Sequence, residues 1–266
     1  MISGGLHANR NLDFQDFLAV PVGASDIAEA MEWLTRLYQK LGAVLRERHY
    51  EGYLVGDEGG YGPRLKSNRE AAELLVRAIE ACRLRPGDDM AIAVDVAASH
   101  FHLEPGYQLQ CGQPAVLGSS ELIDLLDSLA RDFPIISLED PLAENDWAAW
   151  TELTCRLGDR MMVIGDDLLA TSVPRLQRAI EQQAANAVLI KPNQVGTLTE
   201  TLETMRLAQD AGWKTIVSAR SGETEDAFIA DLAVATAADF IKIGSVVRGE
   251  RTAKYNQLLR IAEELS

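Results

Sequence analysis

Basic residues are scarce in this sequence. Of its 266 residues, 25 are Lys or Arg and 40 are Asp or Glu, which gives a formal net charge of −15. A surface of that sign repels phosphate backbones, so we expect no nucleic-acid partner. Long apolar runs are also lacking: no uninterrupted apolar stretch reaches the ~18 residues that a membrane-spanning helix needs, so we expect no membrane association.

Cysteine is rarer than the basic residues. The three cysteines, Cys82, Cys111 and Cys155, have neither the spacing of a metal site nor that of a redox motif. The first residues of the chain lack the apolar core of a secretory signal. Together these features predict reduced thiols and a cytoplasmic location.

The chain is rich in short β-branched runs that alternate with longer amphipathic stretches, a pattern typical of βα units around a parallel sheet. The expected strands lie at residues 17–22, 90–94, 134–138, 161–164, 187–190, 214–218 and 240–243. The expected helices include residues 121–132, 173–183 and 198–211. No linker divides the sequence, so we expect one barrel-like α/β domain over residues 1–266.

Carboxylates stand at the ends of three expected strands. Asp95, Glu139 and Asp166 each directly follow a largely apolar run. The carboxyl ends of barrel strands open onto one face, so these side chains are expected to meet there. An oxygen-only ligand set suits Mg²⁺. The alternative for each acid is a helix cap or a pair with an arginine.

Two lysines occupy equivalent positions on later strands. Lys191 follows one strand and Lys242 lies within another, so both are expected across the barrel mouth from the acids. A lysine close to a metal ion can act as a base, and removing a proton beside a carboxylate creates an enediolate whose charge a metal stabilises. A plain salt bridge is the alternative for either lysine alone.

Two further patterns carry less information. The glycine-rich segment GDEGGYGP (56–63) holds two acids but lacks the Lys-Ser/Thr end of a phosphate-binding P-loop. His100 and His102 are alternate residues, which is a poor signal for zinc. By their spacing alone, neither pattern predicts a site.

Seven segments in chain order resemble the enolase family over essentially the whole sequence. They are GDEGGYGP (56–63), DVAAS (95–99), SLEDPLAENDW (137–147), GDDL (165–168), NAVLIKPNQVGTLTET (186–201), RSGETEDAFIADLAVAT (220–236) and ERTAKYNQLLRIAEEL (250–265). The resemblance implies an enolase-type TIM-like barrel with an antiparallel second strand. It also implies a Mg²⁺-dependent lyase that interconverts 2-phosphoglycerate and phosphoenolpyruvate in glycolysis.

The resemblance assigns roles to individual residues. The positions that match ligands of the first magnesium are Asp95, Glu139 and Asp166. Lys191 matches the base that removes the C2 proton, and Glu58 matches the acid that helps the C3 hydroxyl leave. The substrate-binding positions are His7 on a mobile loop near the phosphate, Asp16, Arg220 and Ser221 on the phosphate side, and Lys242 at the carboxylate.

The sequence also departs from the family pattern. Ala219 stands where family members have a substrate-proximal histidine, Asp16 replaces a glutamate, and His100 stands where glutamate is typical. The family's N-terminal α+β domain, whose loop serine helps to bind a second magnesium, is expected to have no counterpart in this sequence. The first barrel strand is also expected to be absent, because only seven strands are found. Unpaired strand edges invite pairing, so we expect a homodimer or association with a complementary chain.

These features leave three functional hypotheses. The first is a working enolase-type dehydratase, at full or reduced rate, acting on a small phosphorylated acid. The second is a related enzyme that keeps the enolate chemistry but takes another substrate, such as an intermediate of a phosphonate pathway. The third is a non-catalytic remnant that binds a partner enolase.

Overall fold

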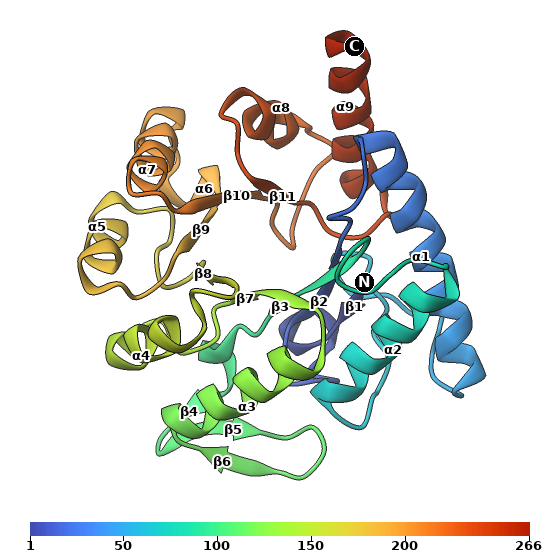
Figure 1. The fold of residues 1–266 in the computed structure, drawn as a ribbon, viewed down its shortest axis with the longest axis horizontal. Helices are drawn as coiled ribbons and strands as arrows, with labels where there is room; N and C mark the ends of the chain where they lie inside the picture. Colours follow the sequence, from blue (N-terminus) through green and yellow to red (C-terminus); the bar gives the residue numbers. More distant parts are fainter.

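A curled eight-stranded sheet forms the centre of the computed structural model, which describes residues 1–266 (Figure 1). In spatial order its strands are β1 (Ile2–Ser3), β2 (Asp16–Val20), β3 (Ala91–Asp95), β7 (Ile135–Glu139), β8 (Met162–Gly165), β9 (Ala187–Ile190), β10 (Lys214–Ser218) and β11 (Phe240–Lys242). Strand β2 is antiparallel to β1 and β3, whereas β3 and the strands after it in the sheet are parallel. The predicted α/β barrel-type fold is confirmed.

The expected count of seven strands is too low by one, because a first strand is present. Strand β1 consists of two residues, in which Ile2 pairs with Phe17 and Ser3 pairs with Asp16. A two-residue strand has no alternation that a sequence pattern can reveal. No pairing joins β1 to β11, so the sheet remains open between its two ends.

Helices surround the outside of the sheet (Figure 1). They are α1 (Ile27–Glu47), α2 (Asn68–Ala81), α3 (Ser119–Asp132), α4 (Trp147–Leu157), α5 (Val173–Gln182), α6 (Pro192–Val195), α7 (Leu198–Asp210), α8 (Phe228–Ala235) and α9 (Gly249–Leu265), with 3₁₀ turns at η1 (Gly5–Ala8) and η2 (Ala98–Phe101). Polar side chains start several of them: Ser67 and Thr197 each accept a hydrogen bond from the backbone N–H of the glutamate three residues later. Such caps satisfy N–H groups that have no partner within the helix.

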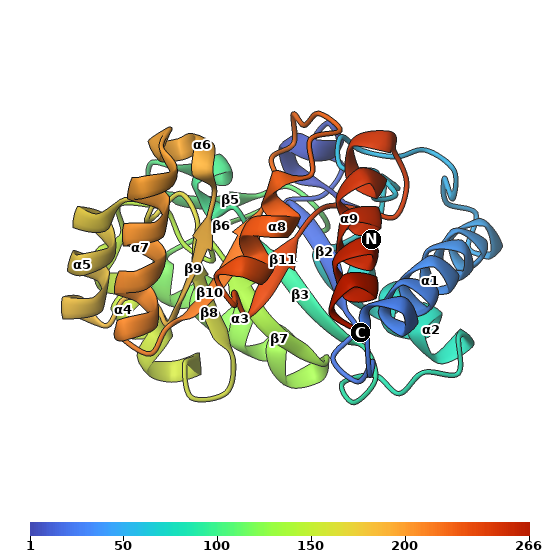
Figure 2. The same ribbon diagram turned by 90° about the horizontal axis from the view of Figure 1, so that it is seen from above.

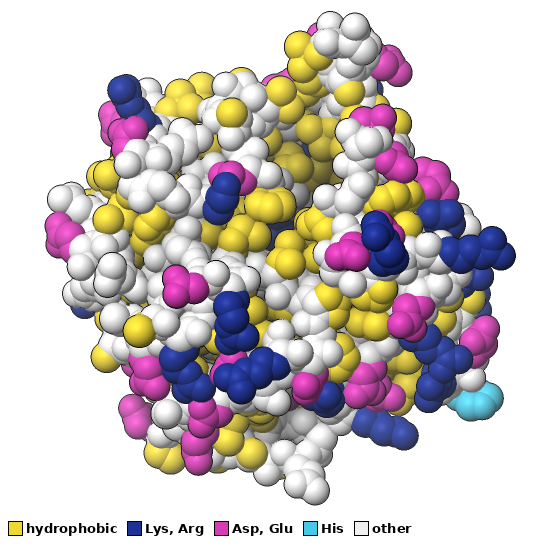
Figure 3. Space-filling view, viewed as in Figure 1, with side chains coloured by type: hydrophobic (Ala, Val, Ile, Leu, Met, Phe, Trp, Pro, Cys, Tyr) yellow, Lys and Arg dark blue, Asp and Glu magenta, His cyan; other side chains and the backbone are white.

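The apolar residues divide into two unequal clusters. The main cluster of 56 buried residues includes most of the helix faces that cover the sheet. A second cluster holds only Ile164, Ala187, Leu189 and Ile216, from three neighbouring strands. A cavity of about 320 Å³ lies beside it, lined mostly by apolar residues and reaching Glu139 and Lys242 at its polar end. Figure 3 shows a hollow lined by hydrophobic side chains beside α9.

Two other features complete the fold. A small antiparallel sheet of β4 (His102–Leu103), β5 (Gly106–Leu109) and β6 (Ala115–Leu117) interrupts the βα alternation between β3 and α3. Figure 2 shows α6, the loop after β10 and the turn η1 at the same edge of the molecule. None of the helices combines the length and apolar character needed to cross a bilayer.

Candidate active site

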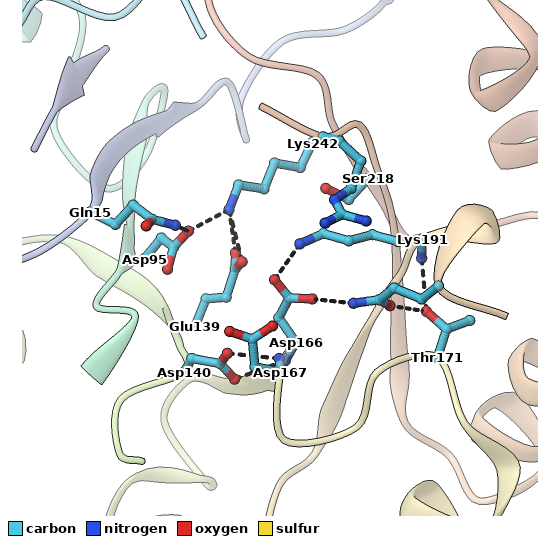
Figure 4. Close-up of polar contacts among 12 residues, drawn as sticks. Gln15, Asp95, Glu139, Asp140, Asp166, Asp167, Thr171, Lys191, Ser218 and Lys242 are labelled. Carbon is cyan, nitrogen blue, oxygen red and sulfur yellow. Dashed lines mark hydrogen bonds and ion pairs between the residues drawn. The ribbon is translucent and has the colours of Figure 1, made fainter. Parts of the chain in front are cut away.

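Lys242 joins two of the three predicted metal ligands (Figure 4). Its Nζ donates to Asp95 Oδ2 and to both carboxylate oxygens of Glu139, each at 2.8 Å. Adjacent parallel strands position these acids, since Asp95 lies opposite Glu139 in the β3–β7 register. The Gln15 amide also donates to Asp95 Oδ2, at 3.2 Å. The sequence-based expectation that strand-end charges would meet therefore holds for this group.

Lys191 and Asp166 form a second pair beside the first (Figure 4). The Lys191 ammonium donates to Asp166 Oδ2, and the Gln194 amide donates to Asp166 Oδ1 at 3.2 Å. Thr171 fixes the strand end, because its hydroxyl accepts the Lys191 backbone N–H at 2.9 Å. The negative charge of Asp166 raises the pKa of Glu139, so the two pairs act on each other electrostatically.

Asp140 orients the strand end that carries Asp166. Its two carboxylate oxygens accept the backbone N–H groups of Asp166 at 2.9 Å and Asp167 at 2.7 Å. Burial raises the pKa of Asp140 well above its ordinary value, and the charges of Asp166 and Asp167 raise it further. Asp140 therefore fixes the geometry of the site at a position where its own ionisation is opposed by burial and by the neighbouring acids.

The pKa values of the two acids bound to Lys242 shift in opposite directions. Burial raises the pKa of Glu139 well above its ordinary value, and the Asp95 charge adds to this rise. Burial also opposes ionisation of Asp95, but the Lys242 ammonium outweighs it and lowers the pKa of Asp95. The cluster thus holds one firmly ionised pair, while Glu139 resists ionisation until more positive charge is present.

A third acidic group lies around the turn η1. Asp16 Oδ1 accepts the Ser3 hydroxyl at 2.8 Å, and Asp16 Oδ2 lies 2.6 Å from His7 Nδ1. The Glu58 carboxyl lies within 4.8 Å of the ligand atoms of His7 and Asp16. Burial raises the pKa of Glu58, and the Asp16 charge raises it further. A carboxyl in this environment retains its proton to higher pH and can donate it to a substrate.

The His7–Asp16 pair predicts a pH dependence of stability. Burial alone would lower the pKa of His7, but the hydrogen bond and charge of Asp16 outweigh it and raise the pKa above the ordinary 6.5. The stabilisation is therefore fully present below pH 6.5 and is lost as the pH rises through the higher folded-state value. We expect the unfolding free energy of wild type, compared with His7→Gln, to fall over this range in urea titrations.

The exposed His102 provides the control for this prediction. His102→Gln should keep the wild-type pH profile. Identical pH profiles for wild type and His7→Gln would show that the pair contributes nothing to stability.

The predicted phosphate-side residues follow β10. The Arg220 guanidinium donates to Asn193 Oδ1 at 3.1 Å, and Ser221 is exposed. Ala219, in the position of the family histidine, is buried and donates its N–H to the Lys242 carbonyl at 2.9 Å. No imidazole can therefore reach the substrate from this position.

The ligand atoms gathered around the strand ends and the turn η1 suit a divalent cation. Two groups place three candidate ligand atoms within 4.8 Å of one another: His7, Asp16 and Glu58, and Asp140, Asp166 and Asp167. The predicted trio of Asp95, Glu139 and Asp166 is not such a group. Lys242 bonds to Asp95 and Glu139, and Lys191 bonds to Asp166. Hard oxygen donors, together with a Glu139 that resists ionisation, nevertheless fit an ion that adds positive charge at the strand ends.

Several contributors to the site were not predicted from the sequence. Gln15 and Gln194 bind acids of the site through amides, and Thr171 and Asp140 bind backbone N–H groups. Asp140 could have been considered, because it directly follows Glu139 in the sequence. The other residues have no distinguishing local pattern, since their role depends on which strands become neighbours.

Comparisons with known proteins agree with this architecture. A family model described as "Enolase, C-terminal TIM barrel domain" matches residues 1–266. Over 265 residues the chain is 50% identical to Enolase of Acidothermus cellulolyticus, covering 100% of this chain and 61% of that protein. It is 49% identical over 265 residues to Enolase 1 of Methylococcus capsulatus, covering 100% of this chain and 63% of that protein. The chain thus spans about three fifths of the length of these relatives. On the match over its whole length, the chain belongs to the enolase C-terminal TIM barrel domain family.

Proposed function

We propose that the chain acts as an enolase-type lyase that dehydrates 2-phosphoglycerate to phosphoenolpyruvate. The observation that carries the proposal is the paired lysine–carboxylate cluster at the strand ends, with Lys242 on Asp95 and Glu139 and Lys191 on Asp166. Such a cluster offers a base beside acids that can bind a metal. A glycolytic role would place the chain in the cytoplasm.

Two residues carry the proton transfers in this mechanism. Lys191 must act as a neutral amine: its lone pair takes the proton at C2, which makes it an ammonium, and the electrons of that C–H bond pass into the carboxylate as an enediolate. Glu58 then donates its proton to the C3 hydroxyl, the C3–O bond breaks, water leaves and the double bond forms. The raised pKa of Glu58 supports this role, since the acid must still hold its proton when substrate binds.

The remaining residues bind the substrate. Lys242 would contact its carboxylate, while Arg220 and Ser221 would contact its phosphate. A divalent cation, expected to be Mg²⁺, would be held by Asp95, Glu139 and Asp166. The chemistry that it supplies is stabilisation of the negative charge that develops on the substrate carboxylate.

An ultraviolet assay of phosphoenolpyruvate formation tests the proposal. Purified chain with 2-phosphoglycerate should turn over in Mg²⁺ and stop when a chelator is added. Asp166→Asn should lose most of this activity, because it removes a charge from the proposed ligand set. A folded sample with no turnover at any Mg²⁺ concentration would refute the proposal.

An altered substrate is a second candidate function. It is favoured by the buried Ala219, which leaves the site without the family histidine, and by the shorter acid at Asp16. The same assay, repeated with phosphonate analogues of the substrate, separates the two functions. A higher kcat/KM for a phosphonate acid than for 2-phosphoglycerate would favour the second.

A further inference from the structure

Two cations of helix α9 are completely buried although neither belongs to the acid–lysine cluster. Arg251 and Lys254 are each 0% exposed. Burying a charge is costly unless it is paired and hydrogen-bonded. The contacts that these side chains make should therefore show which parts of the structure they hold together.

The Arg251 guanidinium connects two separate parts of the site. Its Nη2 donates to the Ser221 carbonyl at 2.7 Å. Its Nη1 donates to the Arg220 carbonyl at 2.6 Å and to the Ile243 carbonyl at 3.2 Å. Arg220 and Ser221 follow β10, whereas Ile243 follows Lys242 at the end of β11. One planar group thus holds the backbone that carries Arg220 against the strand that carries Lys242.

Close packing reinforces this connection. Gly244 adopts φ +109°, and a Cβ at this position would lie 2.8 Å from Arg251 Cδ. The backbone after β11 therefore contacts the Arg251 side chain too closely for a larger residue. Arg251 Nε is buried without a hydrogen-bond partner. The three carbonyl contacts of Nη1 and Nη2 therefore carry the connection, and Nε lies 3.9 Å from Glu250 Oε1.

Lys254 and Glu223 hold the other side of the same loop. Lys254 Nζ donates to the Thr224 carbonyl at 2.8 Å and forms an ion pair with Glu223 Oε2 at 2.9 Å. Glu223 Oε1 accepts the backbone N–H of Arg220 at 3.0 Å. The loop at residues 220–224 is therefore fixed by buried charges at both ends.

We propose that Arg251, supported by Lys254 and Glu223, is a positioning residue that sets the separation between Arg220 and Lys242. The inference rests on the proposed function, in which these two cations contact the phosphate and the carboxylate of one substrate. A ligand with two anionic ends requires that separation to be correct, whereas inorganic phosphate requires only the Arg220 side.

Calorimetric binding to Arg251→Lys tests the effect on ligands. Lysine keeps the positive charge but lacks the fork that reaches several carbonyls at once. We expect affinity for 2-phosphoglycerate to fall about tenfold or more, because misplaced binding groups lose much of their combined effect, while affinity for inorganic phosphate changes less than about threefold. Equal losses for both ligands, or no loss for either, would overturn the proposal.

Amide hydrogen exchange tests the structural part independently of any ligand. Peptides covering residues 220–224 should exchange faster in Arg251→Lys and in Glu223→Gln. The glutamine side chain has nearly the shape of glutamate but lacks the charge that pairs with Lys254. Glu225→Gln, at an exposed position in the same loop, should exchange as wild type does.

The outcomes also separate this proposal from the proposed function. Unchanged exchange in both test variants refutes the positioning role whatever the ligands do. Wild type that is protected at residues 220–224 but binds 2-phosphoglycerate no better than phosphate instead refutes the two-ended substrate contact.

Discussion

Replacing Lys242 with methionine should strongly destabilise the chain at neutral pH. Lys242 Nζ makes three hydrogen bonds of 2.8 Å to the buried carboxylates of Asp95 and Glu139. Without the ammonium, two buried acids lie side by side and lose the one cation that bonds to both, which leaves only the charges of groups such as Lys191 that bond to neither. Breaking a buried pair in this way costs ~3–5 kcal/mol, so we expect a loss of that size at pH 7 in urea unfolding.

The pH dependence of this loss has a definite sign. Without Lys242, burial should raise the folded-state pKa of both carboxyls above their unfolded values, so we expect the folded variant to bind more protons than the unfolded chain. Its stability should therefore recover as the pH falls, and most of the difference from wild type should disappear in acid. Under the proposed function, added Mg²⁺ should also restore part of the loss, because it binds only the folded state.

Lys214 offers a matched control. Its Nζ lies 2.7 Å from Asp239 Oδ1, but the Lys214 side chain is 56% exposed. Exposed ion pairs contribute ~0–1 kcal/mol, so Lys214→Met should fall within that range. If Lys242→Met were no less stable than Lys214→Met at pH 7, the buried charge cluster would not have the importance that its geometry implies.

Under the proposed function, catalysis should be almost abolished in Lys191→Ala and in Glu58→Gln. General acid–base groups contribute ~10²–10⁴-fold to rate, so each variant should lose kcat by a factor in that range. Lys191 would no longer accept the C2 proton, and an amide at position 58 could not donate a proton to the leaving hydroxyl. The measurement is the initial rate of phosphoenolpyruvate formation in saturating Mg²⁺.

Two controls make this result specific. Lys66→Ala removes an exposed lysine and should leave kcat unchanged, whereas the residual rate of Lys191→Ala sets the upper limit on any contribution of host enzyme. The raised pKa of Glu58 means that its acid form is lost as the pH increases, so wild-type kcat should fall through that pKa. Turnover that survives in both variants would remove these residues from the proton transfers.

The barrel could be predicted from sequence because parallel strands give strong local signals. All four residues of β9 are buried, so the strand reads as a continuous apolar run, and its predicted bounds are those of the structure. The long helix α1 was not predicted, although its Asp26 cap and amphipathic face are present in the sequence. The small sheet β4–β6 was also missed, because its strands are only two to four residues long.

The sequence predicted which strand-end residues would meet, but it predicted neither their arrangement nor the contributions of Gln15, Gln194 and Thr171. Strand-end position brought Asp95, Glu139 and Lys242 together correctly, since the carboxyl ends of parallel strands share one face. That Lys242 would lie between the two acids depends on side-chain conformations across the barrel. The roles of Arg251 and Lys254 depend on where α9 packs, and a helical pattern in the sequence does not give that position.

The buried cations of α9 also have a consequence for biosynthesis. Arg251 bonds to a carbonyl 31 residues earlier in the chain, so the loop that carries Arg220 emerges from the ribosome well before the helix that fixes it. Domains are translated from the N-terminus at ~5–20 residues per second, which leaves a delay of seconds before α9 can dock. During most of that interval Lys242 has not been made either, and the loop at residues 220–224 lacks the cations of α9 that hold it. Under the proposed function, substrate binding at Arg220 therefore cannot assist folding until translation has passed Lys254.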